Sequence, residues 1–294
     1  MPQNCRAVAL DDLGVLRIRG SDATSFLQGQ LSNDMDRLEH ESSLLAGYHN
    51  PHGRVIALLR VVRAAPDDIR AILPRELVRP VAERLKRYVL RAKVQLSDDS
   101  ASWCVRGIIA ADGAAPDEPG DAALCVKVAD GPARWLALEP RSDAATPFAG
   151  EHRRAWALLD IAQGLPQVYA RTSEAFVAQM LNLDRIGAID FSKGCYTGQE
   201  VVARAHYRGR VKRRMQRLRA RSPVPLSPGD GGVLADGRSF RIVDAVRLDE
   251  GVSEFLAVAP LDAGAAGGAV EDEETPGSAP LAAEMLPLPY ALTE

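Results

Sequence analysis

The first hundred residues contain two regions in which apolar and polar residues follow a strand pattern. In Val15–Arg19 apolar and basic residues alternate, as they do along a strand with one buried face. Further along, the apolar runs Val55–Val62 and Ile69–Leu73 flank a turn-forming Pro and Asp segment at residues 64–68. This arrangement predicts a hairpin in an antiparallel sheet.

Two helices are expected beside these strands. Ser21 or Asp22 can cap a short helix that contains Phe26 and Leu27. A second region has an apolar residue at every fourth position, with charged residues between them: Leu77, Val81, Leu85 and Val89. This period predicts an amphipathic helix packed on the sheet, and Pro80 inside it predicts a late start or a kink.

Four further apolar segments predict strands on either side of a Gly-, Pro- and Asp-rich loop at Asp112–Asp121. These segments are Ala92–Leu96, Trp103–Ala110, Leu124–Val128 and Trp135–Leu138. Strands and helices segregated along the chain in this way are typical of an α+β domain rather than a wound βαβ sheet. The predicted fold class is therefore α+β.

The last 140 residues change from helical to strand-like patterns near Pro223. Trp156–Ile161 is amphipathic, and Ser173 can cap a second helix with an apolar face of Phe176, Met180 and Leu183. Beyond Pro223, short apolar segments alternate with turns, which predicts a small β-barrel or sandwich. The Gly- and Ala-rich, acidic segment Asp262–Ala279 is expected to be a loop.

Length and composition limit the classes of function. The chain has 294 residues, of which 46% are hydrophobic and 26% charged, and this fits two or three globular domains. A net charge of -3 gives no basis for nucleic-acid binding by the whole surface. The chain contains no CxxC pair among its cysteines, which are Cys5, Cys104, Cys125 and Cys195. We therefore expect no zinc knuckle or local disulfide framework, and a reducing compartment.

The sequence predicts neither a leader peptide nor a membrane span. Residues 1–10 lack the apolar core of a secretory signal and the arginines of a presequence. Arg60 and Arg63 interrupt even the most apolar segment, so no run reaches roughly 18 apolar residues. We therefore expect a cytoplasmic protein without membrane association.

The most distinctive residues surround Cys195, in the sequence Lys193-Gly194-Cys195-Tyr196-Thr197-Gly198-Gln199-Glu200. A nucleophilic or ligating cysteine needs thiolate character, which a nearby cation favours, and a sulfur that is not buried. Lys193 supplies a cation, and the glycines and polar residues around the thiol do not pack as an apolar core. We therefore predict an exposed loop with a functional thiol.

A basic stretch follows this loop. Arg204–Arg221 contains nine Lys or Arg residues and no acidic residue. This stretch favours an anion-binding or RNA-binding surface about as well as it favours a solvated basic strand. The chain also has His49, His52 and His206, but lone histidines in such segments are more often solvated surface residues than ligands. No metal site is predicted.

Several blocks in the same order carry a resemblance to a known family: Phe26–Asp34, Asn50–Val55, Gly164–Pro166 with Asn182–Leu183, and Phe191–Arg204. The last block includes the KGCYTGQE sequence and resembles the signature of the YgfZ-type folate-binding proteins. These proteins are relatives of the aminomethyltransferase (T-protein) of glycine cleavage. The resemblance spans residues 10 to 215, is most specific at the signature, and is weak in the C-terminal part.

The resemblance implies a T-protein-like α+β fold, with antiparallel sheets and packed helices, in which three domains form a ring. Residues 1–45 and 145–212 would form a discontinuous folate-binding domain. Residues 46–144 would form a second α+β domain with an antiparallel sheet, and residues 213–294 a small β-barrel domain. A monomer is expected.

The resemblance also implies binding of tetrahydrofolate, or another reduced folate, in support of iron-sulfur cluster assembly or repair, including that of iron-sulfur enzymes that modify tRNA. Its partners would be the reduced folate and iron-sulfur proteins or assembly factors. Cys195 would be the functional thiol, and Lys193 would favour its thiolate. The folate would be bound by Tyr196, Gly194, Gly198, Gln199, Glu200, Arg204, Asn33 and Asp34.

Departures from the T-protein relatives argue against classical aminomethyl transfer. Ala57 and Leu58 stand where those enzymes have an Asp pair, and an alkyl side chain cannot act on an amine proton. Ala162 stands where they have a Glu that holds the pterin. Two alternatives remain beside the folate-binding iron-sulfur role: a folate-dependent aminomethyltransferase, and an RNA-binding or partner-docking module that uses Arg204–Arg221.

Overall fold

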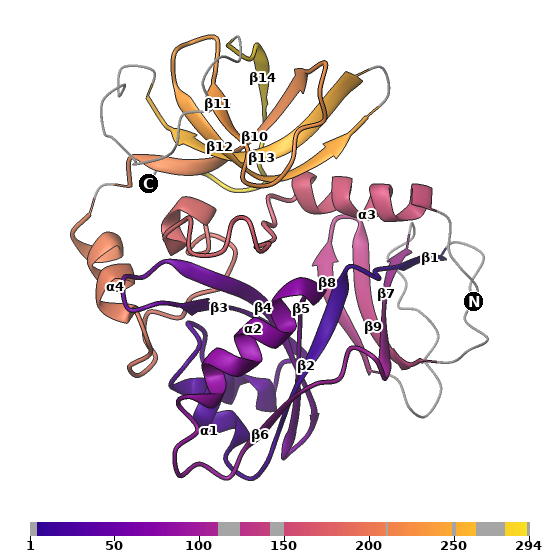
Figure 1. Cartoon of the computed structure of the whole chain (residues 1–294), viewed down its shortest axis with the longest axis vertical. Coiled ribbons are helices and arrows are strands. Elements are labelled where there is room, and N and C mark those ends of the chain that lie inside the picture. Colours follow the sequence, from indigo (N-terminus) through magenta and orange to yellow (C-terminus); the bar gives the residue numbers. More distant parts are fainter. Residues whose placement is uncertain are drawn as a thin grey trace. The chain divides into compact units, whose positions relative to one another are not determined.

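The computed structural model describes residues 5–110, 124–141, 150–209, 211–248, 251–262 and 280–292. The chain divides into two compact units, each made of segments that are separate in the sequence. The first unit comprises Met1–His49, Ile56–Trp156 and Ala188–Thr197. The second comprises Asn50–Val55, Ala157–Gly187 and Gly198–Glu294. Figure 1 labels the helices and strands of both units.

The first unit contains a five-stranded antiparallel sheet in the order β3-β4-β5-β2-β6. Its strands are β2 (Leu13–Arg19), β3 (Ser43–His49), β4 (Val55–Ala65), β5 (Asp68–Pro74) and β6 (Gln95–Asp98). Two short helices join β2 to β3, namely α1 (Ala23–Gln28) and the 3₁₀ helix η1 (Met35–Glu39). The hairpin expected from the apolar runs is confirmed as β4 and β5, which pair from Arg60–Ile72 to Ala65–Asp68.

The helix α2 (Arg75–Lys86) packs against β2, β5 and β6 of this sheet, as the four-residue period predicts (Figure 1). Its buried face includes Leu77 and Leu85. Gly14 on β2 provides space for the helix, because a Cβ at this position would lie 2.7 Å from Cγ2 of Val78. The predicted late start is wrong: the helix begins at Arg75, whose guanidinium donates hydrogen bonds to the carbonyls of Asp11 and Leu13 at the start of β2.

A second, four-stranded antiparallel sheet of the first unit has the order β1-β7-β9-β8. Its strands are β1 (Cys5–Ala9), β7 (Trp103–Ala110), β8 (Leu124–Asp130) and β9 (Ala133–Pro140). Trp156 from α3 (Gly150–Ala162) packs into the core of this sheet beside Val105 and Leu136. Gly107 permits this packing, because a Cβ there would lie 2.5 Å from the Trp156 ring.

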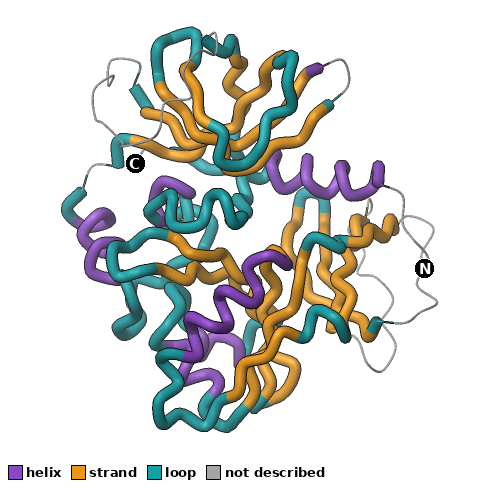
Figure 2. Tube along the Cα trace, viewed as in Figure 1, coloured by secondary structure: helices purple, strands orange, loops and turns teal. Residues whose placement is uncertain are grey.

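The second unit contains a five-stranded sheet in the order β11-β12-β13-β10-β14. Its strands are β10 (Arg213–Arg221), β11 (Gly231–Val233), β12 (Ser239–Arg247), β13 (Val252–Pro260) and β14 (Ala283–Leu286). Figure 2 shows that strands and loops make up nearly all of this C-terminal part. The described residues form no closed barrel, so the expected small barrel is not confirmed, although one isolated bridge joins Leu234 to Leu281.

The prediction of an α-helix after Ser173 is wrong. Only the short 3₁₀ helix η2 (Ala178–Leu181) forms there, and Asn182 ends it in the left-handed region with φ 56°. The preceding backbone pairs with another segment instead, because Val55 N donates to the carbonyl of Phe176 at 2.8 Å. These backbone groups are therefore used in a strand-like contact that a local sequence period cannot reveal.

The predicted strand Ala92–Leu96 begins later than expected, at Gln95. Lys93 is diverted from the sheet because its N–H donates to the Asp22 carboxylate at 2.7 Å. This contact also explains why Asp22, at the N-cap position of α1, makes no side-chain cap hydrogen bond. The bond to Lys93 is the largest cause that lowers the pKa of the Asp22 carboxyl below its usual value.

The expected absence of a membrane span and the expected loops are considered only for the residues that the structure describes. No described helix is long and apolar enough to cross a membrane. The loop expected at Asp112–Asp121 and residues 263–279 of the loop expected at Asp262–Ala279 lie outside the described residues.

Candidate functional site

The segment Asp190–Thr197, called the cysteine loop below, is held at its start by Asp190. The Asp190 carboxylate accepts hydrogen bonds from the N–H groups of Ser192 and Lys193, at 2.7 and 3.1 Å. Its own N–H donates to the carbonyl of Ser32 at 2.9 Å. An aspartate that bonds to its own backbone two residues ahead forms a turn, which here directs the chain toward Lys193.

Lys193 anchors the loop to the last residue of α1 and the segment that follows it. Its buried ammonium donates to the carbonyl oxygens of Gln28, Leu31 and Asn33, at 2.7, 2.6 and 2.9 Å. An ammonium has three donors, so these carbonyls use all of them. Burial lowers the pKa of Lys193 to about 8, and the nearby carboxylate of Asp34 partly opposes this shift.

Tyr196 turns inward from the same loop and forms a small buried cluster with His49. The Lys193 Nζ lies 5.2 Å from the centre of the Tyr196 ring, and the His49 ring centre lies 5.9 Å from it. Burial raises the pKa of Tyr196 and lowers that of His49 to about 4. Neither ring nitrogen of His49 has a hydrogen-bond partner among the described residues. The expectation that this histidine is a solvated surface residue is therefore wrong.

Cys195 lies between these two inward-facing residues and is itself exposed, with its thiol not in a disulfide. The loop thus presents the sulfur to solvent while Lys193 and Tyr196 hold the backbone on either side. The three hydrogen bonds of the Lys193 ammonium go to carbonyls and not to the Cys195 sulfur. A Cβ added to Gly194 would meet no atom within 4 Å, so nothing in the described residues crowds the backbone beside the thiol.

Asn33 and Asp34, both expected to bind folate, lie on the segment that Lys193 holds. The buried Asn33 amide donates to the carbonyl of Leu45 at 2.8 Å. Asp34 accepts a hydrogen bond from the Gln28 amide at 2.8 Å and caps η1. The structure therefore brings these two residues to the cysteine loop, and both use their side chains in bonds that shape the protein.

The remaining expected residues of the signature belong to the second unit. Gly198 adopts the left-handed region with φ 83° and begins α4 (Gln199–Tyr207). Glu200 and Arg204 form an i,i+4 ion pair at 3.8 Å on the exposed face of this helix. Such exposed pairs contribute little to stability, which leaves both side chains available to a ligand.

The block Asn50–Arg54 packs beside α4 in the second unit. The Asn50 side-chain carbonyl accepts from the N–H groups of His52 and Arg54, both at 3.0 Å, and its amide donates to Glu174 at 2.6 Å. Gly53 has φ 71°, and a Cβ there would lie 2.9 Å from Cβ of Val201 on α4. Gly53 therefore allows both the positive φ and the close contact between this block and α4.

No carboxylate lies at the positions where the resemblance to the T-protein led us to look for one. Ala57 and Leu58 are buried in β4, with 0% and 3% exposure, and Ala162 is the last residue of α3. Among the described residues no group of three or more His, Cys, Asp or Glu side chains has the arrangement of a metal site.

Three arginines of the basic stretch form ion pairs with acidic residues of other elements. Arg214 on β10 forms a bidentate ion pair with Asp184, with distances of 3.0 and 2.9 Å. Arg217 and Arg219 both pair with the buried carboxylate of Glu254 on β13, at 2.6 and 3.1 Å. These three arginines therefore have acidic partners within the second unit, and only Arg214 is buried.

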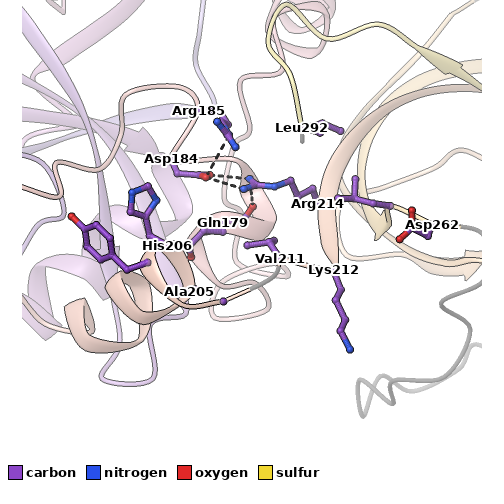
Figure 3. A pocket seen from close by; sticks show the side chains of 13 residues that line it. Gln179, Asp184, Arg185, Ala205, His206, Val211, Lys212, Arg214, Asp262 and Leu292 are labelled. Carbon is purple, nitrogen blue, oxygen red and sulfur yellow. Dashed lines mark hydrogen bonds and ion pairs between the residues drawn. The ribbon is translucent and has the colours of Figure 1, made fainter. Parts of the chain in front are cut away.

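The second unit also contains a pocket of about 630 Å³, called the α4 pocket below (Figure 3). Its walls come from the end of α4, the start of β10 and the segment after η2: Gln179, Asp184, Arg185, Ala205, His206, Tyr207, Gly209, Val211, Lys212, Arg214, Leu261, Asp262 and Leu292. None of the residues expected to form the site lines it. His206, Lys212 and Arg214 belong to the basic stretch, but the pocket itself could not be predicted because its walls meet only in the folded chain.

Comparison with known proteins places these observations in a family. A scan against protein-family profiles finds no match. A Haemophilus influenzae protein named "Uncharacterized protein" is 31% identical over 209 residues, which is 71% of this chain and 71% of that one. The chain belongs to the family of this protein. The Haemophilus protein bears no functional name, so the family membership does not identify an activity.

Two solved structures resemble the chain in fold. The aminomethyltransferase T of the glycine cleavage system from Bartonella henselae has a TM-score of 0.66 and 13% identity, over 87% of this chain and 78% of that chain. The chain therefore has a T-protein-like, mixed α+β fold with antiparallel sheets. A heterotetrameric sarcosine oxidase from Corynebacterium sp. matches 46% of this chain and 75% of its own, with 13% identity and a TM-score of only 0.30.

Proposed function

We propose that this protein binds a reduced folate, with tetrahydrofolate as the first candidate, and supports iron-sulfur cluster assembly or repair through Cys195. The observation that carries the proposal is an exposed, free thiol on a loop anchored by Lys193, within a T-protein-like fold. The expected partners are iron-sulfur proteins or their assembly factors, including enzymes that modify tRNA.

The contacts of the loop support specific roles. Cys195 supplies the sulfur, because a thiol that is exposed and unpaired can reach a ligand or a partner protein. Lys193 positions the loop and contributes positive charge near it. Glu200 and Arg204 on α4 are exposed and can contact a folate tail, and Gly198 fixes the start of that helix.

The arrangement in three domains remains part of the proposal. A discontinuous domain of residues 1–45 and 145–212, a second domain of residues 46–144 and a C-terminal domain of residues 213–294 would together form a ring around a central hole, and the α+β domains would hold the folate. The T-protein-like fold supports this arrangement. We also propose that the protein acts as a monomer.

Folate binding is tested directly by titrating the full-length protein with tetrahydrofolate under anaerobic conditions, and by mass spectrometry of any ligand that copurifies. We expect saturable binding with a Kd in the micromolar range, on the order of -8 kcal/mol. Cys195→Ala is expected to retain this binding, because the role proposed for the sulfur is chemical. Cys104→Ala serves as the matched control, since Cys104 is also a free thiol but is only partly exposed. Absence of binding in the native protein would refute the folate part of the proposal.

Aminomethyl transfer is the second candidate, because the similar fold is that of an aminomethyltransferase. Ala57, Leu58 and Ala162 weigh against it, since none can exchange a proton or hold a pterin by a hydrogen bond. Release of ammonia from an aminomethyl carrier in the presence of tetrahydrofolate would establish it. No release at high protein concentration would exclude it.

A further inference from the structure

The α4 pocket contains a buried hydrogen-bond acceptor that no described residue satisfies. The side chain of Gln179 is almost wholly buried, at 1% exposure. Its amide nitrogen donates to the carbonyl of Val202 on α4 at 2.7 Å, which fixes the orientation of the group. Its amide oxygen, Oε1, has no hydrogen-bond partner. A buried acceptor without a donor is unfavourable, so an N–H or O–H group brought by a ligand would stabilise this position.

The same pocket contains a guanidinium with unused donors. Figure 3 shows Asp184 between Arg185 and Arg214. Arg214 already binds both carboxylate oxygens of Asp184, at 3.0 and 2.9 Å. The Nε of Arg185 forms an ion pair with the Asp184 carboxylate at 3.7 Å, which is beyond hydrogen-bond distance, and this buried Nε has no hydrogen-bond partner among the described residues. Arg185 can therefore bind an oxyanion without giving up an existing hydrogen bond.

The other walls favour an organic ligand over an inorganic ion. Val211, Leu261 and Leu292 provide apolar surface, and the volume of about 630 Å³ lies in the range of small-molecule sites. Once Arg214 and Asp184 are paired, the charged lining residues are Arg185, Lys212 and Asp262, which leaves a net positive charge. This charge matches a ligand with a single anionic group.

We propose that the α4 pocket binds a small organic anion whose carboxylate or phosphate contacts Arg185 and whose N–H or O–H donates to Oε1 of Gln179. Its apolar part would pack against Val211 and Leu261. The proposal is independent of the folate and iron-sulfur role, because none of the residues assigned to that role lines the pocket.

Two probes of the full-length protein distinguish the anionic groups. Hippurate carries a carboxylate, an amide N–H and a ring, and adenosine 5′-monophosphate carries a phosphate, several donors and a ring. Each is titrated by calorimetry beside its uncharged counterpart, hippuramide or adenosine. We expect at least one anion to bind with a Kd below about 1 mM, and its counterpart to bind about tenfold more weakly or worse. The tighter anion identifies the group that Arg185 recognises.

Substitutions test whether the anion binds in the α4 pocket. Arg185→Gln is expected to weaken the bound anion at least about tenfold and to leave its uncharged counterpart unaffected. Arg171→Gln is the matched control, since Arg171 belongs to the same unit, has an acidic partner, Asp230, at 3.0 Å, and is more exposed than Arg185. It should bind like the native protein. The proposal is overturned if neither anion binds below about 1 mM, or if Arg185→Gln binds the anion as tightly as the native protein does.

Discussion

At the scale of single residues, Lys193 and His49 show how buried polar groups shape the cysteine loop. The Lys193 ammonium donates hydrogen bonds to three carbonyl oxygens. The ring nitrogens of His49, by contrast, have no hydrogen-bond partner among the described residues. The sequence predicted the exposure of Cys195 from its polar neighbours. It could not predict the burial of His49, because that depends on the contact with Tyr196 from a distant part of the chain.

Replacing Lys193 tests its anchoring role. Lys193→Met keeps most of the side-chain volume and leaves three carbonyl oxygens without their donor. We expect the free energy of unfolding, measured by urea denaturation, to fall by about 3 kcal/mol. Lys127→Met is the control, because Lys127 is an exposed lysine whose partner Asp130 is even more exposed. A loss for Lys193→Met no larger than that of the control would show that the three hydrogen bonds do not hold the loop.

The buried His49 predicts a pH dependence of stability. Its folded pKa of about 4 lies below the usual 6.5, so the unfolded chain binds more protons between these values. The free energy of unfolding should therefore fall as the pH is lowered from 6.5 toward 4, by about 2 kcal/mol at pH 5. His49→Gln should remove this part of the pH dependence, whereas the variant at the exposed His52, His52→Gln, should retain it. Identical pH profiles for native protein and His49→Gln would contradict the assignment.

At the scale of elements, local patterns predicted what depends on local sequence and failed where distant segments meet. Two apolar runs around a turn predicted the β4–β5 hairpin, and the four-residue period predicted α2. The helix expected after Ser173 failed because the backbone of Phe176 pairs with Val55. The basic stretch likewise looked unpaired along the sequence, yet β13 brings Glu254 beside it.

Close packing between the Asn50–Arg54 block and α4 gives a prediction at this scale. Gly53→Ala would have to keep a positive φ and place its Cβ 2.9 Å from that of Val201. We expect thermal or urea unfolding to show a loss of about 2 to 3 kcal/mol. Gly237→Ala isolates the backbone cost, because Gly237 has φ 85° and no atom within 4 Å of a new Cβ. It should lose about 1 to 2 kcal/mol.

A second substitution separates contact from backbone strain. Val201→Ala keeps Cβ but removes Cγ1, which would lie 3.0 Å from the new methyl group, so it should relieve part of the clash and cost less in the Gly53→Ala background than in the native protein. This coupling is the expected sign of a steric contact. Additive effects of the two substitutions would mean that the block and the helix do not pack as described.

At the scale of the whole molecule, the comparisons establish the fold and the family of the chain but not its activity. The T-protein-like fold was expected from the signature blocks and agrees with the aminomethyltransferase T structure. The α4 pocket could not be predicted, because its orphan acceptor on Gln179 and its unused donors on Arg185 arise only when η2, α4 and β10 meet. The chemistry at Cys195 remains the central proposal.

The most direct test of this central claim is the activity of an iron-sulfur tRNA-modifying enzyme in cells whose only copy of this protein carries Cys195→Ser. The modified nucleoside in total tRNA is measured beside cells that carry the native protein or Cys104→Ser, with equal protein levels confirmed. We predict that Cys195→Ser lowers the modification to the level of cells without the protein, and that Cys104→Ser does not. Native levels of modification with Cys195→Ser would contradict the account.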